Sequence, residues 1–315
     1  MDKPLVIIAG PTACGKTATS IELAKKINGE IISADSMQVY KYMDIGTAKA
    51  TKQEMQGIPH YLIDEFYPDE EFNVMIFQKK AKDYIDQIYK KGNIPILVGG
   101  TGFYINALVF DNNFVEEESD SNLRNELYEL AEKNGAEYLH NMLKEFDPES
   151  AEKIHYNNVK RVARAIEFYK KTGKPISEHN KEAKSKSSPY KTAFIVLDMD
   201  RQKLYERINK RVDVMIEDGL VDEVKMLLEK GYKKELVSMQ GLGYKEIVAY
   251  INGETSLEEA IEKLKQSTRH FAKRQLTWFR GQTDGLWIDI SDGDVDNAVN
   301  KIIDYMEKID LKFEG

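Results

Sequence analysis

The segment from Gly10 to Thr17 constrains this chain more than any other part of its sequence. It reads Gly10-Pro11-Thr12-Ala13-Cys14-Gly15-Lys16-Thr17 and matches the pattern G-x-x-x-x-G-K-[ST] in full. The apolar run Pro4–Ala9 precedes it, and a helical pattern follows it. In such a loop the backbone N–H groups face phosphate oxygens, the lysine adds positive charge, and the final hydroxyl binds magnesium. We therefore predict that these eight residues bind a diphosphate, with Thr17 as a ligand to Mg²⁺.

Strand-like and helix-like segments alternate in the first third of the chain. Strand-like runs at Pro4–Ala9, 30–34 and 94–98 alternate with helical patterns at 16–28 and 73–91. This alternation is typical of a parallel sheet with helices on both faces. We predict an α/β fold, a P-loop NTPase-like doubly wound parallel sheet.

A helical insertion is predicted in the middle of the chain. After an acidic loop at 115–120, helical segments at 122–134, Ala136–Phe146 and 157–171 follow one another with no strand between them. The stretch 179–188 is rich in Lys, Ser and Glu and poor in apolar residues. Such a composition buries little apolar surface, so we predict a mobile linker there.

The core pattern resumes after this insertion. A strand is predicted at 191–197, and the helix after it repeats Leu204, Ile208, Val212 and Met215 at helical spacing. Helices at 221–230 and 257–279, the glycine-broken stretch 240–244, a strand at 286–290 and a last helix complete the chain. The predicted organisation is a core formed by 1–114 and 191–315, with a helical subdomain at 115–190.

The charge of the chain is unevenly distributed. The net charge of −8 argues at first against a nucleic-acid partner, because polyanion binding leaves a basic footprint. However, 151–192 holds eleven Lys or Arg and four Glu, a local charge of +7. The segment 263–280 holds six basic residues and no acid. A single basic cluster is commonly a solvated face, but two of them beside a phosphate loop favour a polyanionic substrate.

Membrane and export signals are not expected. No apolar run approaches the ~20 residues that a membrane span needs, and Met1-Asp2-Lys3 is followed at once by a strand pattern. The expected location is therefore the cytoplasm. The single cysteine, Cys14, cannot form an internal disulfide and lies at a variable position of the phosphate loop.

The acid expected for phosphoryl transfer is missing from its usual place. The strand at 94–98 ends in Gly99-Gly100-Thr101-Gly102 rather than in a magnesium-binding acid, which argues against an ordinary nucleotide hydrolase. Asp35 and Ser36 instead follow the strand at 30–34, at the edge where such sheets bind ligands. Asp35 is a candidate general base or magnesium partner. It could equally cap a turn, and its position alone leaves both roles open.

Further motifs extend along the chain. They are Asp35-Ser36-Met37-Gln38-Val39-Tyr40, Met43-Asp44-Ile45-Gly46-Thr47-Ala48-Lys49, Gly99-Gly100-Thr101-Gly102-Phe103-Tyr104, Asn158-Val159-Lys160-Arg161-Val162-Ala163-Arg164-Ala165-Ile166-Glu167 and Ala272-Lys273-Arg274-Gln275-Leu276-Thr277-Trp278-Phe279-Arg280. In this order they resemble the tRNA dimethylallyltransferases of bacterial type, and the resemblance covers nearly the whole chain. It implies transfer of a dimethylallyl group from dimethylallyl diphosphate to N6 of the adenosine just 3′ of the anticodon, with release of diphosphate.

The resemblance also implies roles for single residues. Asp35 would remove the N6 proton, and Thr101 would lie at the reaction centre, although a glycine turn with Thr101 as a helix cap is the structural alternative. Lys16 and Arg207 would hold the diphosphate. Arg211, one turn after Arg207, is left open between diphosphate contact and a surface ion pair. Mg²⁺ is the implied cofactor, and the implied enzyme is a monomer.

The implied RNA partner is the anticodon stem-loop of tRNA. The residues expected to contact it are Asp35, Ser36, Met37, Gln38, Thr101, Arg124, Lys160, Arg161, Arg164, Lys273 and Arg274. Trp278 and Phe279 suit base stacking by their chemistry, but a place in the core is equally open. The chain departs from the family pattern at Cys14, where Ser is frequent, and at Lys160, where Gln is usual.

Two other functions compete with this interpretation. An ATP-dependent P-loop small-molecule kinase would transfer a phosphoryl group without RNA. A non-catalytic RNA-binding module would carry a vestigial phosphate loop, which the intact Lys16-Thr17 pair and Asp35 argue against. Label from dimethylallyl diphosphate appearing in tRNA separates the transferase from both.

Overall fold

The computed structural model describes residues 3–111, 121–184 and 188–311. The strands are β1 (Pro4–Ala9), β2 (Gly29–Ser33), β3 (His60–Tyr61), β4 (Ile94–Gly99), β5 (Lys191–Asp198) and β6 (Leu286–Asp289). The helices are α1 (Lys16–Ile27), α2 (Lys52–Met55), α3 (Val74–Lys90), α4 (Gly102–Val109), α5 (Ser121–Asn134), α6 (Ala136–Phe146), α7 (Pro148–Lys153), α8 (Val159–Thr172), α9 (Ile176–Lys184), α10 (Arg201–Glu217), α11 (Leu220–Glu229), α12 (Tyr244–Ile251), α13 (Leu257–Gln282) and α14 (Val295–Lys308), with the 3₁₀ turn η1 (Ser238–Gln240). Two compact units result, one formed by Met1–Val109 with Ser188–Gly315 and the other by Phe110–Ser187.

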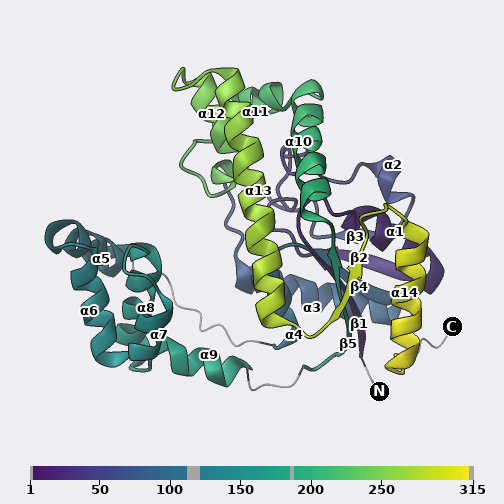
Figure 1. The fold of residues 1–315 in the computed structure, drawn as a ribbon, viewed down its shortest axis with the longest axis horizontal. Helices are drawn as coiled ribbons and strands as arrows, with labels where there is room; N and C mark the ends of the chain where they lie inside the picture. Colours follow the sequence, from purple (N-terminus) through teal and green to yellow (C-terminus); the bar gives the residue numbers. More distant parts are fainter. Residues whose placement is uncertain (1–2, 112–120, 185–187, 312–315) are drawn as a thin grey trace. The chain divides into compact units, whose positions relative to one another are not determined.

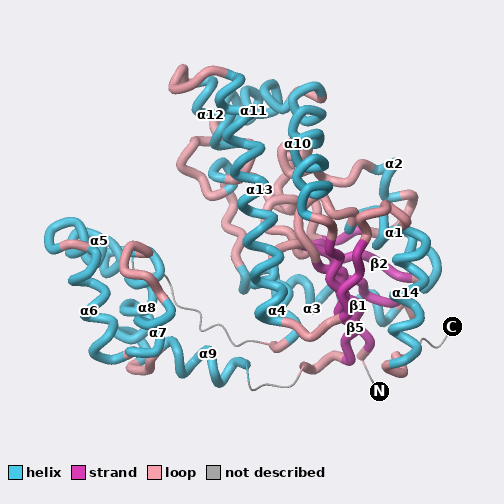
Figure 2. Tube along the Cα trace, in the orientation of Figure 1, coloured by secondary structure: helices cyan, strands magenta, loops and turns pink. Residues whose placement is uncertain are grey.

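The first unit is built on a six-stranded sheet in the order β3-β2-β4-β1-β5-β6 (Figures 1 and 2). All its strand pairs are parallel, and β1 lies between β4 and β5, with Ile7 opposite Leu97 on one side and Phe194 on the other. The predicted doubly wound parallel sheet is therefore confirmed. The two-residue strand β3 was not predicted, because two residues carry no periodicity.

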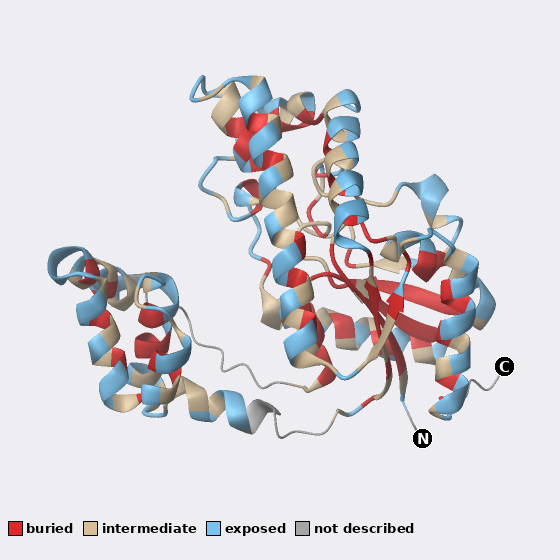
Figure 3. Cartoon of the chain, viewed as in Figure 1, coloured by how far each residue is buried: buried red, intermediate tan, exposed pale blue. Residues whose placement is uncertain are grey.

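The sheet is covered on both faces. Residues Leu5 to Ala9 of β1 are fully buried, which explains why this strand is a continuous apolar run rather than an alternating one (Figure 3). Val6 and Ile8 belong to the core that β1 shares with α1 and α14. Helices α3 and α4 pack against β4 from the opposite face. The fold thus directs the carboxyl ends of β1, β2 and β4 to one edge, where their loops meet.

Helices α10 to α13 form a layer beside that edge (Figure 1). Helix α13 begins with a capping box, in which Ser256 accepts a hydrogen bond from the Glu259 N–H and the Glu259 carboxylate accepts one from the Ser256 N–H. Its 26 residues pack against α10, α12 and α4. The glycine-broken stretch 240–244 leads directly into α12, which begins at Tyr244. No helix in the described residues has the length and hydropathy needed to cross a bilayer.

The second unit is helical, as predicted, but its described part holds five helices rather than three. Leu127, Leu143, Val162 and Ile166 belong to a core that α5, α6 and α8 share. The prediction of a mobile linker is wrong over 179–184, which belongs to α9. Lys and Glu are good helix formers, and the His179 ring packs 5.1 Å from that of Phe168, so the polar composition did not prevent a helix. Residues 185–187 and the predicted acidic loop at 115–120 lie outside the described residues.

Candidate active site

A cavity of about 400 Å³ opens at the carboxyl edge of the sheet. The loop after β1, the end of β2, the end of β4 and the helices α10 and α13 all contribute to its wall. The predicted residues that line it are Thr12, Ala13, Gly15, Lys16, Thr17, Asp35, Gln38 and Arg207. The predicted residues Gly10, Pro11, Cys14, Ser36, Met37, Thr101, Lys273 and Arg274 belong to the same unit but are not part of this wall.

The phosphate loop has a backbone that only certain residues tolerate. Gly15 has φ 101°, a left-handed conformation that glycine adopts without steric cost, and Ala13 has φ 65°. Lys16 begins α1, and its ammonium donates hydrogen bonds to the carbonyls of Gly10 and Pro11, at 3.0 and 2.6 Å. The loop therefore wraps around the lysine at the amino end of a helix, where an anion is favoured.

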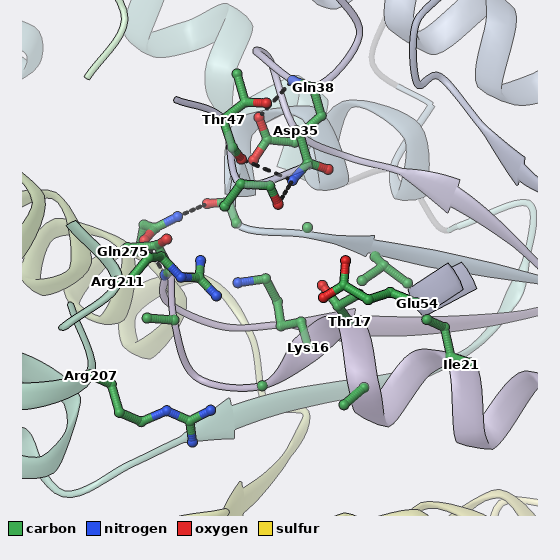
Figure 4. A pocket seen from close by; sticks show the side chains of 18 of the residues that line it. Lys16, Thr17, Ile21, Asp35, Gln38, Thr47, Glu54, Arg207, Arg211 and Gln275 are labelled. Atoms are coloured by element: carbon green, nitrogen blue, oxygen red, sulfur yellow. Dashed lines mark hydrogen bonds between the residues drawn. The ribbon is translucent and has the colours of Figure 1, made fainter. Parts of the chain in front are cut away.

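Three cationic side chains meet at the cavity. Lys16, Arg207 and Arg211 line it, and the ammonium of Lys16 points toward the Arg211 guanidinium (Figure 4). Burial lowers the pKa of Lys16 from its ordinary value, and Arg211 lowers it further while Cys14 and Asp35 oppose the shift. Among the described residues none of the three cations has an ion-pair partner. Three cations that are not ion-paired, gathered at one cavity, form a binding site for a polyanion.

The structure bears on one of the two roles left open for Arg211. Its side chain is half-buried on α10 and lines the cavity, so a surface ion pair with a described residue is excluded. Burial lowers the pKa of Arg211, and the neighbouring charge of Arg207 lowers it further against the opposite influence of Cys14 and Glu54. An arginine nevertheless stays charged at neutral pH.

Asp35 lies two residues beyond the end of β2 and faces the cavity. Its Oδ1 accepts hydrogen bonds from the N–H groups of Met37 and Gln38, at 2.8 and 3.4 Å. Asp35 therefore caps a turn, as one interpretation expected. Its Oδ2 has no hydrogen-bond partner among the described residues, which leaves one carboxylate oxygen for a ligand.

The Gly99–Gly102 turn lies between the strand end that carries Asp35 and helix α13. A Cβ on Gly100 would lie 2.1 Å from Nε2 of Gln275, and one on Gly102 would lie 2.2 Å from the ring of Trp278. Only glycine permits such close approach. Trp278 is thus half-buried against this turn, whereas Phe279 is fully buried in the core and cannot stack on a base. Thr101 lies within the turn and donates its N–H to the carbonyl of Ala34 at 3.3 Å.

Comparison with known proteins identifies the family of this chain. The family model described as IPP transferase matches residues 38–282. The chain belongs to this family. It is 59% identical over 297 residues to the tRNA dimethylallyltransferase of Lachnoclostridium phytofermentans, covering 94% of this chain and 95% of that protein. It is 56% identical over 305 residues to the protein of the same name from Acetivibrio thermocellus, covering 97% of each.

Solved structures of IPP transferases give the same result. The full-length tRNA isopentenylpyrophosphate transferase of Bacillus halodurans is 45% identical, with a TM-score of 0.74 over 98% of both chains. A eukaryotic dimethylallyltransferase described as acting on tRNA is 32% identical, with a TM-score of 0.80 over 97% of this chain and 80% of its own. The family membership, the prenyltransferase class and the P-loop NTPase-like fold predicted from sequence are thereby confirmed.

Several residues of this IPP transferase site were missed by sequence reasoning. Thr47 and Ala48 line the cavity, and their carbonyls accept hydrogen bonds from Nε2 of Gln38 at 3.2 and 3.4 Å. Gln38 thus joins this loop to the turn that Asp35 caps. Gln275 on α13 also lines the cavity. A glutamine inside a basic and aromatic segment carries no signal of its own, so only its tertiary contacts identify it.

Glu223 of α11 binds the backbone of the loop just before Thr47. Its buried carboxylate accepts hydrogen bonds from the N–H groups of Asp44, Ile45 and Gly46, at 2.8 to 3.0 Å, and from the Tyr244 hydroxyl at 2.7 Å. Burial and the Glu223 charge raise the pKa of Tyr244 well above its ordinary value, so the hydroxyl stays a donor. The nest of amides makes Glu223 a structural anchor for the cavity wall.

We expect Glu223→Gln to lower the free energy of unfolding by about 1–3 kcal/mol, because an amide nitrogen in place of one oxygen leaves a buried donor unpaired. Denaturant unfolding followed by circular dichroism measures this change. Glu229→Gln, an exposed position on the same helix, is the matched control and should leave stability unchanged. Equal stability of both variants would remove the anchoring role.

The predicted RNA contacts of the helical unit divide into two groups. Lys160, Arg161 and Arg164 are exposed on α8, opposite its buried apolar side. Arg124 instead donates hydrogen bonds from Nε and Nη2 to the buried Glu167, at 3.0 and 2.6 Å. That guanidinium is engaged in the packing of α5 on α8, so its RNA contact stays a prediction, as do those of the three exposed residues.

The remaining predicted RNA contacts lie on the first unit. Lys273 and Arg274 are exposed on α13, and the Arg274 guanidinium lies 5.7 Å from the centre of the Phe271 ring, which borders the cavity. Met37 is half-buried, and its methyl group packs against Gly241. Because α13 carries exposed cations next to the cavity, it suits a polyanion that enters there.

Proposed function

We propose that this chain transfers the dimethylallyl group of dimethylallyl diphosphate to N6 of the adenosine at tRNA position 37, releasing diphosphate. The observation that carries this proposal is the placement of Asp35 in the same cavity as Lys16, Arg207 and Arg211. A polyanion site and a free carboxylate oxygen within one cavity match a reaction that expels diphosphate and removes a proton. Membership of the IPP transferase family supports the same reaction.

On the donor side, the bond from carbon 1 of the dimethylallyl group to the diphosphate oxygen breaks, and the electron pair leaves with the diphosphate. Positive charge aimed at that oxygen lowers the barrier because negative charge accumulates there in the transition state. Lys16, Arg211 and the amides of the phosphate loop provide this charge, and Arg207 stands at the same wall. The cations thus act on a leaving group and not on a phosphoryl donor.

The residues beside the phosphate loop fit a magnesium ion. The Thr17 hydroxyl has no hydrogen-bond partner in the described residues, and the Glu54 carboxylate lies next to it in the cavity (Figure 4). Oxygen donors of this kind suit Mg²⁺. Thr17 would hold the ion, which when bound supplies further positive charge to the diphosphate.

On the acceptor side, the new bond joins N6 of adenine to carbon 1, and N6 gives up one proton. An exocyclic amine on a purine is a weak nucleophile, so removal of that proton assists attack. Oδ2 of Asp35 is the atom that would accept it, since Oδ1 is held by the turn. The adenine must leave its stack to reach this cavity, which costs less in a single-stranded loop than in a duplex.

We assign the exposed cations of α8 and α13 to the anticodon stem-loop. Exposed positive charge suits phosphate contacts, and Lys160, Arg161, Arg164, Lys273 and Arg274 all present it. Because the proposed tRNA and prenyl diphosphate substrates are both water-soluble, we propose that the enzyme acts in the cytoplasm. We propose a monomer on family resemblance alone.

The proposal is tested by incubating the protein with dimethylallyl diphosphate labelled in the prenyl group, Mg²⁺ and unmodified tRNA. Label in the RNA, located at the adenosine 3′ of the anticodon, is the expected result. ATP hydrolysis with phosphorylation of a metabolite and no label in RNA would support a P-loop kinase instead. A tRNA with guanosine at that position is the matched control and should take up no label.

Arg161→Ala should weaken tRNA binding about 3–10-fold and lower the slope of log K against log salt by about 0.7–0.9, because one phosphate contact no longer releases a counterion. Filter binding or fluorescence anisotropy over a series of salt concentrations measures both. Lys133→Ala removes the same charge from an exposed position on α5 and controls for net charge. An unchanged slope in Arg161→Ala would mean that Arg161 makes no phosphate contact.

A further inference from the structure

Gln275 is a buried polar side chain in the middle of α13. Its exposure is 7%, and the other buried residues of this helix, Ala260, Leu264, Ala272 and Phe279, are apolar. A polar group in such a position lowers stability unless its hydrogen bonds are made. Both ends of the amide are in fact used, and both partners are loops of the cavity wall.

The amide of Gln275 joins two loops that follow different strands. Its Nε2 donates to the carbonyl of Gly100 at 3.0 Å, in the turn after β4. Its Oε1 accepts from the N–H of Thr12 at 2.9 Å, in the phosphate loop after β1. Figure 4 places Gln275 at the cavity wall near Arg211. One side chain therefore connects the diphosphate loop, the Gly99–Gly102 turn and α13.

The chemistry of the two partners selects an amide. The Thr12 N–H can only donate and the Gly100 carbonyl can only accept, so the side chain between them must do both. An ionised glutamate accepts only, and methionine of nearly equal length has neither a donor nor a strong acceptor. The 2.1 Å between Nε2 and a Cβ built on Gly100 shows that the turn also needs glycine to receive this amide.

The turn that Gln275 holds is connected to the proposed base. Gly99 packs directly on the backbone of Ala34, the residue before Asp35, with 2.3 Å from a Cβ built on it to the Ala34 oxygen. The N–H of Thr101 bonds to the same oxygen. The Gly99–Gly102 turn is therefore fixed to the residue next to Asp35, so the turn and Asp35 move together. Thr12 belongs to the loop that holds the diphosphate.

We propose that Gln275 is a positioning residue that fixes the spacing between the diphosphate loop and the side of the cavity that carries Asp35. This inference rests on the proposed function, because that spacing sets the distance between carbon 1 of the donor and N6 of the acceptor. Each substrate keeps its own binding groups when the bridge is removed. What is lost is the alignment of the two reacting atoms.

Gln275→Met tests this role. We expect kcat to fall about 30-fold with both KM values within about threefold, because a misplacement near 1 Å lowers rate more than binding. The stoichiometry of inorganic pyrophosphate binding, measured by calorimetry, should stay unchanged. Gln266→Met makes the same chemical change at an exposed position of α13 and should behave as the wild type. A fall in stoichiometry parallel to kcat would show a folding defect and overturn the positioning role.

Hydrogen exchange provides a readout that does not depend on the reaction. Loss of the Gln275 acceptor should speed exchange in the peptide that contains Thr12 about tenfold or more, with no such change in Gln266→Met. Unchanged exchange together with unchanged kcat would overturn the proposal. Absence of transfer by the wild-type protein would overturn the proposed function instead, and exchange would still decide whether Gln275 orders the loop.

A double-mutant cycle provides a second route if Gln275→Met folds poorly. Gly100→Ala should lower kcat by itself, because its methyl group displaces the Gln275 amide. In the Gln275→Ala background the methyl group has room, so the double variant should lose about fivefold less activity than the product of the two single losses. Losses that multiply without such coupling would contradict joint action of the two residues.

Discussion

Replacing Asp35 by asparagine should lower kcat for prenyl transfer by about 10²–10⁴-fold, the range found for loss of a general base. Asparagine keeps the oxygen that accepts from the Met37 and Gln38 N–H groups, so the turn should remain in place. Single-turnover transfer of labelled prenyl group into tRNA measures the rate, and tRNA affinity should stay within about threefold because no charge–phosphate contact is lost. The substitution thus separates the proton acceptor from the turn cap.

Asp86→Asn is the matched control for this experiment. Asp86 is exposed on α3, where its carboxylate lies 3.7 Å from the Lys3 ammonium, and it does not line the cavity. It should transfer prenyl groups at the wild-type rate. Near-wild-type turnover of Asp35→Asn would mean that capping is the whole contribution of this residue.

Lys16→Met should lower kcat/KM for dimethylallyl diphosphate by about 10²–10³-fold, because it removes a cation from the oxygen where charge develops. It should also weaken binding of inorganic pyrophosphate, whereas tRNA binding should change little. Lys26→Met on the same helix is the control, since Lys26 is exposed and bonds to Asn300 at the surface. Equal pyrophosphate affinity of Lys16→Met and wild type would place the diphosphate elsewhere.

The pH dependence gives a second test of Lys16. Burial lowers the pKa of this ammonium, so as pH rises its proton is lost earlier than that of a surface lysine. Pyrophosphate affinity of the wild type should therefore decrease with rising pH, beginning below the ordinary lysine pKa. Lys16→Met should lack this decrease, and a decrease that persists in the variant would assign the titration to another group.

Much of the first unit could be predicted because its signals are local. The buried strands β1 and β4 are nearly continuous apolar runs, as expected of strands buried on both faces of a sheet. The phosphate loop could be predicted for the same reason, since eight consecutive residues carry all the groups that bind the diphosphate. Part of helix α9 was predicted as a mobile linker because its composition is polar. The contact between His179 and Phe168 depends on a second helix, α8, and composition does not show it.

The site was only partly predictable from sequence. Lys16, Thr17, Asp35 and Arg207 follow from motif, position and family resemblance, and all four line one cavity. The place of Arg211 in the cavity wall could not be predicted, because helical spacing does not show whether a carboxylate at the surface lies close enough to pair with it. The same spacing, one arginine four residues after another, is compatible with both a surface ion pair and a place in a cavity wall.

The amino-acid sequence by itself determined the parallel sheet, the phosphate loop and the acid after β2, because each depends on residues close together in the chain. Only the tertiary structure decided how these parts are held at one cavity. The Thr12–Gln275 bond joins residues 263 positions apart, and the Asp44–Glu223 bond joins residues 179 apart. No periodicity or spacing encodes such pairs, since they exist only after the strands and helices have packed and brought a buried amide or carboxylate to a loop with unpaired backbone groups.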